Sequence, residues 1–137
     1  MIPEHSNAIE GLEALKRIWL QQTMDELDLL GAAVDSASGA PADLAKEVYR
    51  LFHDLQGQAA LFGYPLLGRV GQSFCAYWRT AGDEFGPDRL PMMRAHLAAA
   101  RKVLDKRLEG PGDDEAGQAI LAELETFARS CPPRITP

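Results

Sequence analysis

The sequence predicts an all-α protein, namely an antiparallel four-helix bundle with one or more additional short terminal helices. Apolar residues recur at helical spacing along every long segment, whereas no segment alternates apolar and polar residues as a strand does. The breaks between these segments, at residues 31–42, 81–87 and 110–114, are short and rich in Gly, Pro, Ser and Asp. Short links between amphipathic helices favour antiparallel packing around one core.

The first predicted helix covers residues 7–30, and we expect Gly11 to divide it into a short lead and a long helix. Its apolar residues are Leu12, Leu15, Trp19, Leu27 and Leu30. The second helix covers residues 43–62. Asp43 is its expected N-terminal cap, because an aspartate side chain accepts hydrogen bonds from the free backbone N–H groups at a helix start.

The third predicted helix has Pro65 near its first turn, where proline is well tolerated, and ends near residue 80. Gly63 is the expected hinge between the second and third helices. The fourth helix covers residues 88–108, where apolar residues again recur at helical spacing, and a shorter fifth helix covers residues 116–128.

Length and charge restrict the class of protein. With 137 residues, of which 46% are hydrophobic, the chain is expected to form one helical domain over residues 1–137, with residues 131–137 as a flexible tail. Fourteen Lys and Arg against twenty Asp and Glu give a net charge of −6, which argues against nucleic-acid binding because phosphate binding needs a basic face. A protein or small-molecule partner is favoured.

The sequence shows neither a metal site nor a membrane segment. Cys75 and Cys131 lack metal-ligand spacing, and we expect both to be free thiols in a reducing compartment. No apolar run approaches the roughly 18 residues of a membrane span, and the N-terminus lacks the basic start and apolar stretch of a signal peptide. We therefore expect a soluble, cytoplasmic protein.

The second predicted helix presents a histidine on its outer side. An advance of about 100° per residue from Val48 places the apolar residues on one core stripe, formed by Leu44, Val48, Leu51, Phe52, Leu55, Ala59 and Phe62. His53 falls at about 140° from Val48, so it should face solvent. The same outer face carries Lys46, Arg50, Gly57 and Ala60, with Gln56 at its edge.

These neighbours suit a histidine that acts as a nucleophile or proton acceptor. A neutral imidazole has a free lone pair on one ring nitrogen, and cations at Lys46 and Arg50 would favour the neutral ring and attract an anion. An exposed histidine is more often simply solvated, but Gly57 leaves the next turn open to a bulky group. The surroundings lack paired carboxylates, a Ser or Cys nucleophile and a phosphate-binding loop, so a self-contained catalyst is not indicated. His96 is expected on an unremarkable helix face.

The stretch HDLQGQAALFGYPL, residues 53–66, resembles the signature of the histidine-containing phosphotransfer (HPt) family of small helical bundles. That signature reads His-x-x-Lys-Gly, followed by small residues and a later glycine. The resemblance is closer to a compact stand-alone bacterial subgroup that reads His-Asp-x-Lys-Gly-Gln and then Phe-Gly-Tyr-Pro-Leu. The matching residues are His53, Asp54, Leu55, Gly57, Gln58, Ala59, Ala60, Phe62, Gly63, Tyr64, Pro65 and Leu66.

Two positions depart from the family pattern. Gln56 stands where the family usually carries a lysine beside the phosphoryl group, and glutamine can donate a hydrogen bond but brings no charge. Lys46 and Arg50 are the cations expected to compensate. The family often places a glutamine on the next helix to hold the other ring nitrogen. The usual spacing arrives near Cys75, and the candidate is Gln72, one turn earlier.

The resemblance implies a phosphorelay carrier rather than a self-contained enzyme. A ring nitrogen of His53 would take a phosphoryl group from the aspartyl phosphate of one receiver domain and pass it to another. The receiver supplies the acidic pocket and the magnesium, so no cofactor is expected on this chain. The implied partners are response-regulator receivers and a hybrid histidine kinase, with no nucleic acid and no membrane. We expect a monomer that docks through the face formed by Lys46, Arg50, His53, Gly57 and Ala60.

Two alternatives remain open at this point. An HPt-like adaptor would bind a receiver or a histidine kinase without accepting phosphate, because the family lysine is replaced by Gln56. A dimerisation and phosphotransfer unit of kinase descent would pair two chains through their helices.

Overall fold

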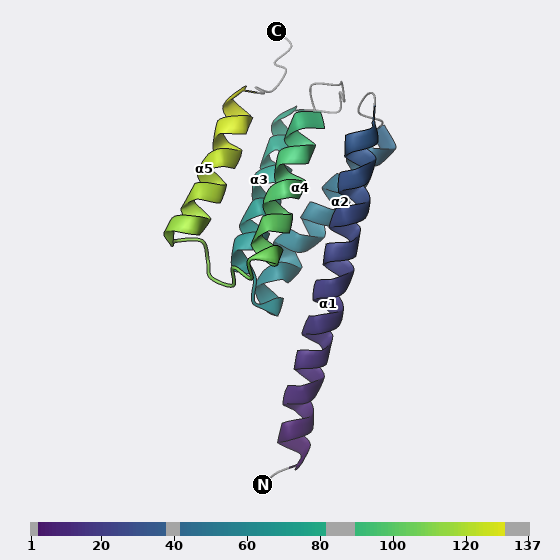
Figure 1. Ribbon diagram of the computed structural model, residues 1–137, viewed down its shortest axis with the longest axis vertical. Helices are drawn as coiled ribbons and strands as arrows, with labels where there is room; N and C mark the ends of the chain where they lie inside the picture. The colour runs from purple at the N-terminus through teal and green to yellow at the C-terminus, as the bar shows by residue number, and fades with distance from the viewer. Residues whose placement is uncertain (1–2, 38–41, 82–89, 131–137) are drawn as a thin grey trace.

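The computed structural model describes residues 3–37, 42–81 and 90–130, and these contain five α-helices and one short 3-10 helix. In chain order they are α1 (Pro3–Ser36), α2 (Ala42–Gln58), the 3-10 helix η1 (Ala59–Phe62), α3 (Pro65–Ala81), α4 (Leu90–Asp105) and α5 (Glu115–Ser130). Helices α1 to α4 run alternately up and down (Figure 1), and α5 packs against α3 and α4. No strand occurs in these residues, so the predicted all-α bundle with an additional terminal helix is confirmed.

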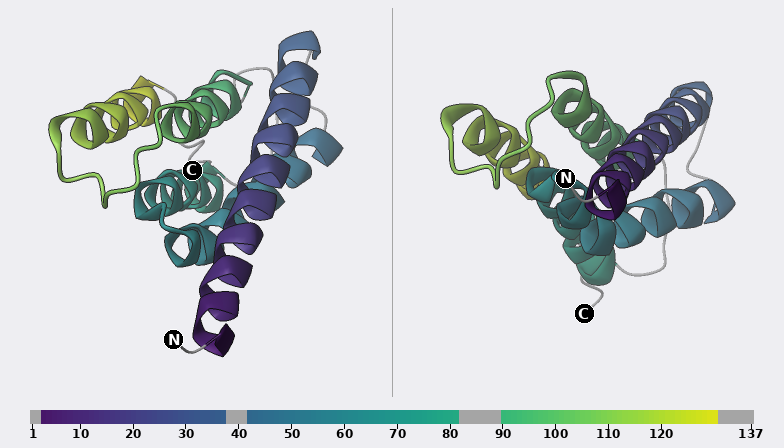
Figure 2. Two further views of the ribbon diagram at one scale, coloured as in Figure 1. Left: turned by 60° about the horizontal axis from the view of Figure 1, so that its bottom comes forward. Right: turned by 90° about the horizontal axis from the view of Figure 1, so that it is seen from below.

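One apolar core lies between the helices of the bundle. The predicted core stripe of α2 is confirmed: Val48, Leu51, Phe52, Leu55 and Ala59 are buried, and Leu44 and Phe62 pack against the core while partly exposed. The view from below in Figure 2 shows α5 on the outer side of the bundle, beside α4 and away from α1 and α2. The surface of α2 that faces away from the core is therefore not covered by α5.

Helix α1 is longer than predicted and projects beyond the other helices at its N-terminal end (Figure 1). The expected split at Gly11 and the expected break beginning at Gly31 are both wrong, because a glycine inside a helix costs only about 1 kcal/mol and does not by itself end it. The projection also leaves Leu12 and Leu15, which belong to the predicted apolar pattern, 67% and 56% exposed.

The turn between α2 and α3 has the predicted glycine hinge. Gly63 has a φ of 90°, a left-handed conformation that favours glycine, and its N–H donates to the carbonyl of Ala60 at 3.1 Å. Pro65 is the first residue of α3, as its restricted φ predicts. The expectation that Asp43 caps α2 is wrong, because α2 begins at Ala42 and Asp43 lies inside its first turn, where its carboxylate is close to the positive end of the helix dipole.

Helices α2 and α3 approach each other closely at a glycine. A Cβ atom added to Gly71 would lie 2.6 Å from the backbone oxygen of Phe52, a distance that real Cβ atoms do not reach. The ring of Phe52 lies 5.0 Å from that of Phe74, measured between centroids. Because Phe52 directly precedes His53, this contact fixes the axial position of α3 along α2 relative to the histidine.

The fourth and fifth helices differ modestly from the prediction. Helix α4 ends at Asp105 rather than near residue 108, because Arg107 has a left-handed φ of 51° and Leu108 donates its N–H to the carbonyl of Val103 at 2.9 Å. Its predicted start and the predicted flexible tail, with Cys131, lie outside the described residues. Helix α5 is slightly longer than predicted. Among the described helices, none has the length and apolar character needed to cross a membrane.

His96 on α4 is fully buried, contrary to the unremarkable helix face that the sequence indicated. Its Nδ1 lies 2.9 Å from the carbonyl oxygen of Met92, so this nitrogen carries the proton and donates. Its Nε2 then accepts from the hydroxyl of Ser73 at 3.0 Å. Burial lowers the pKa of His96 to about 4, although its hydrogen bond to the backbone at Met92 acts in the opposite direction.

Candidate functional site

The outer face of α2 presents His53 to solvent. Its side chain is 64% exposed, whereas those of its neighbours Phe52 and Leu55 are buried. The predicted orientation is therefore confirmed. It follows from the packing of the core stripe, which turns the opposite side of the helix outward.

His53 borders a shallow surface hollow between α2 and α3, which we call the His53 hollow. It is lined by Tyr49, His53, Gln56 and Gly57 of α2 and by Arg79 of α3. A Cβ atom added at Gly57 would meet no atom within 4 Å, so a bulky group can approach the histidine from this turn. Arg79 and Tyr49 were not found by the sequence reasoning.

Aromatic contacts position the last turn of α3 beside the histidine. The ring of Tyr49 lies 4.6 Å from that of Trp78 and 5.8 Å from that of His53, measured between ring centroids. Trp78 directly precedes Arg79, so the aromatic pair brings the guanidinium to the edge of the His53 hollow. Sequence spacing does not show this, because it depends on the register between two helices.

The ring of His53 is only loosely held in the described part of the chain. It makes no hydrogen bond there, and its Nδ1 lies 3.7 Å from a carboxylate oxygen of Asp54, beyond hydrogen-bonding distance. The exposed imidazole is thus open to a reacting group from outside.

The two cations expected to assist His53 do not converge on it. Arg50 donates a hydrogen bond to the carboxylate of Glu47 at 2.9 Å and lies 3.9 Å from Glu26. The hydrogen bond to Glu47 raises the pKa of Arg50 above its ordinary value. Lys46 is exposed on the same face but does not line the His53 hollow. Both remain on the predicted docking face, while Arg79 is the cation in the hollow.

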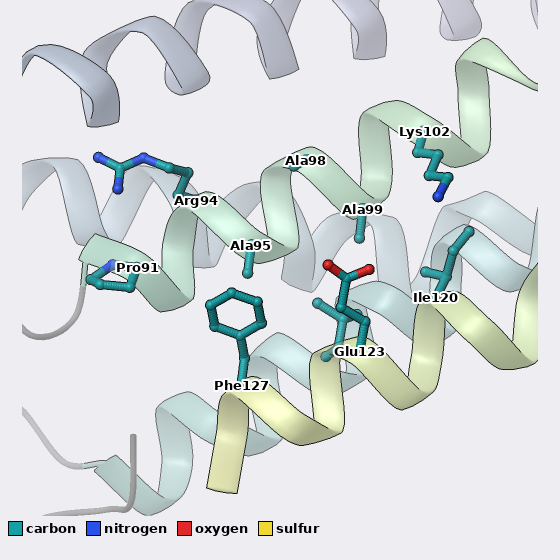
Figure 3. Close-up of a pocket in the computed structure, with 10 residues that line it drawn as sticks. Pro91, Arg94, Ala95, Ala98, Ala99, Lys102, Ile120, Glu123 and Phe127 are labelled. Carbon is teal, nitrogen blue, oxygen red and sulfur yellow. The ribbon is translucent and has the colours of Figure 1, made fainter. Parts of the chain in front are cut away.

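A second hollow lies between α4 and α5, on a different part of the molecule (Figure 3). Ala95 and Ala99 of α4 face Phe127 and Glu123 of α5 across it. It shares no residue with the His53 hollow. Among the described residues, no three His, Cys, Asp or Glu side chains lie together in a way that could hold a metal ion.

Comparison with protein families assigns the chain to a known domain family. The family model described as "Hpt domain" matches residues 14–130, which is most of the chain. The chain belongs to the Hpt domain family. None of the curated proteins and none of the solved structures compared with it gives a match.

Within the Hpt domain, the structure also locates the two positions that depart from the family pattern. Gln56, which departs from the predicted lysine of the motif, lines the His53 hollow. Gln72 instead lines a separate hollow with Leu121 and Glu125 of α5, and the structure does not bring it together with His53. Cys75, which the usual spacing reaches, is a fully buried free thiol whose pKa is raised by burial.

Proposed function

We propose that this Hpt domain relays a phosphoryl group between receiver aspartates and carries it on His53. One observation carries the proposal: of the two histidines whose side chains the structure describes, His96 is buried and His53 is exposed beside an open glycine turn. Hpt domains act in phosphorelays, where they meet receiver domains and kinases. The proposal places the protein in the cytoplasm with response-regulator receivers as its partners.

The chemical step needs little from this chain. A lone pair on a ring nitrogen of His53 forms a bond to phosphorus while the bond from phosphorus to the receiver's aspartate oxygen breaks, and the electron pair leaves with the carboxylate. The reverse step delivers the group to a second receiver. The receiver would supply magnesium, and this chain would supply an exposed imidazole on a rigid helix.

A second candidate keeps the docking but not the transfer. Gln56 brings no positive charge to the His53 hollow, which favours an adaptor that binds a receiver or kinase without accepting phosphate. The two functions differ in one measurable product, phosphohistidine.

A panel of phosphorylated receiver domains from the same genome separates these functions. We expect at least one receiver to lose its phosphoryl group to the wild-type protein and none to lose it to His53→Ala. His5→Ala serves as the control substitution of another histidine. Binding of receivers without any transfer, in the presence of magnesium, would support the adaptor and contradict the relay.

A further inference from the structure

The side chains that line the His53 hollow carry a positive charge and no negative charge. The five residues that line the His53 hollow include one cation, Arg79, one neutral amide, Gln56, and no carboxylate, while Asp54, outside this lining, has a carboxylate oxygen 3.7 Å from Nδ1 of His53. A phosphoryl group on His53 would carry up to two negative charges and three acceptor oxygens. Such a group needs donors, and the hollow offers the guanidinium of Arg79 with five N–H donors in a planar fork.

The other nearby cations are less suited to that role. Arg50 is already paired with Glu47 and lies near Glu26, so its charge is balanced by carboxylates. Lys46 lies outside the His53 hollow. Arg79, in contrast, makes no ion pair with any described residue, and its side chain is exposed at the end of α3. It can therefore move toward a phosphoryl group without first breaking an ion pair within the described chain.

Contacts between α2 and α3 fix the position of Arg79 on α3 relative to His53. The contact of Gly71 with the backbone of Phe52 sets the register of α3 against α2, and the tilted ring contact of Trp78 with Tyr49 anchors the final turn. Tyr49 in turn lies one helical turn before His53 and close to its ring. The guanidinium and the imidazole thus belong to one rigid pair of helices.

We propose that Arg79 binds the phosphoryl group on His53 and supplies from α3 the positive charge that Gln56 does not supply from α2. This inference rests on the proposed function and names a phosphoryl-binding residue for it. In the transfer step, the guanidinium would donate hydrogen bonds to the phosphoryl oxygens as the bond between nitrogen and phosphorus forms.

The test uses phosphoramidate, a small phosphoryl donor that needs no receiver. The attack of His53 on its phosphorus releases ammonia, and the phosphohistidine is quantified by mobility shift and by 31P NMR. Arg79→Gln removes the charge at an exposed helix position, and we expect it to slow labelling several-fold and to shorten the lifetime of phosphohistidine. Arg79→Lys should retain most of the rate. Lys102→Ala, which removes an exposed cation on α4, is the charge-matched control and should label like wild type.

Rescue separates a charge effect from a structural one. Adding Gln56→Lys to Arg79→Gln restores a cation to the His53 hollow and should recover the labelling rate. Wild-type labelling by Arg79→Gln would overturn the inference, and so would a loss that neither Gln56→Lys nor Arg79→Lys recovers. Both of these results leave the relay intact if wild type still receives phosphate from receivers. Wild type that no receiver labels contradicts the proposed function itself.

Discussion

Acid should destabilise the fold through His96. This side chain is fully buried between α3 and α4, and burial lowers its pKa from 6.5 to about 4. Between these two values the unfolded chain binds a proton that the folded chain does not, so the free energy of unfolding falls as the pH falls through this window. A difference of about 2.5 pH units, at 1.36 kcal/mol per unit, gives a loss of about 3 kcal/mol by pH 4.

The assay is urea unfolding of wild type and His96→Gln at several pH values from about 7 down to about 4. The glutamine does not titrate but retains a donor and an acceptor for Met92 and Ser73. Carboxylates titrate equally in both proteins, so their contribution cancels in the difference. We expect the wild type to be the more stable protein near neutral pH and its advantage to shrink by about 3 kcal/mol on acidification. Parallel stability curves for the two proteins would refute the reasoning.

Three further changes test other parts of the structure. Gly57→Glu should abolish receiver binding in calorimetry, because it adds bulk and negative charge to the docking face, while the open space around position 57 leaves the fold intact. Gly57→Ala is the control. Unaltered binding by Gly57→Glu would show that the docking face lies elsewhere. Gln56→Lys should raise the rate of labelling by receivers several-fold at most, since an exposed charge contributes about 1 kcal/mol or less, and a slower rate would contradict this. Gly71→Ala should lower the free energy of unfolding by about 1–3 kcal/mol in urea titrations, because its Cβ would collide with the backbone of Phe52; wild-type stability would argue against the close approach of α2 and α3.

The order of the helices and the exposure of His53 could be predicted from the sequence because both depend on local periodicity. The core stripe of α2 turns His53 outward wherever the helix packs, and Gly63 with Pro65 marks the turn to α3. The extent of α1 could not be predicted in the same way. Glycine at positions 11 and 31 lowers helix propensity, but a long helix can pass through both.

The surroundings of His53 depend on contacts between helices, and there the sequence reasoning failed. Lys46 and Arg50 share a face with His53, yet Arg50 pairs with Glu47 instead of turning toward the histidine. Arg79 lies far along the chain and reaches the site only through the register of α3 on α2. Gly71 marks the close contact of α3 with Phe52, but counting onward from it in an antiparallel hairpin leads toward the N-terminal part of α2. The reach of Arg79 back to the His53 hollow is therefore evident only from the packing of the two helices in the structure.

The most direct test of the central claim is to locate the phosphoryl group after transfer. The protein is incubated with a phosphorylated receiver, digested at mildly alkaline pH and analysed by tandem mass spectrometry. We predict an acid-labile phosphoryl group on His53 and its loss in His53→Ala. A phosphoryl group on any other residue, or none from any receiver that binds the protein, would contradict the assignment of His53 as the phosphoryl carrier.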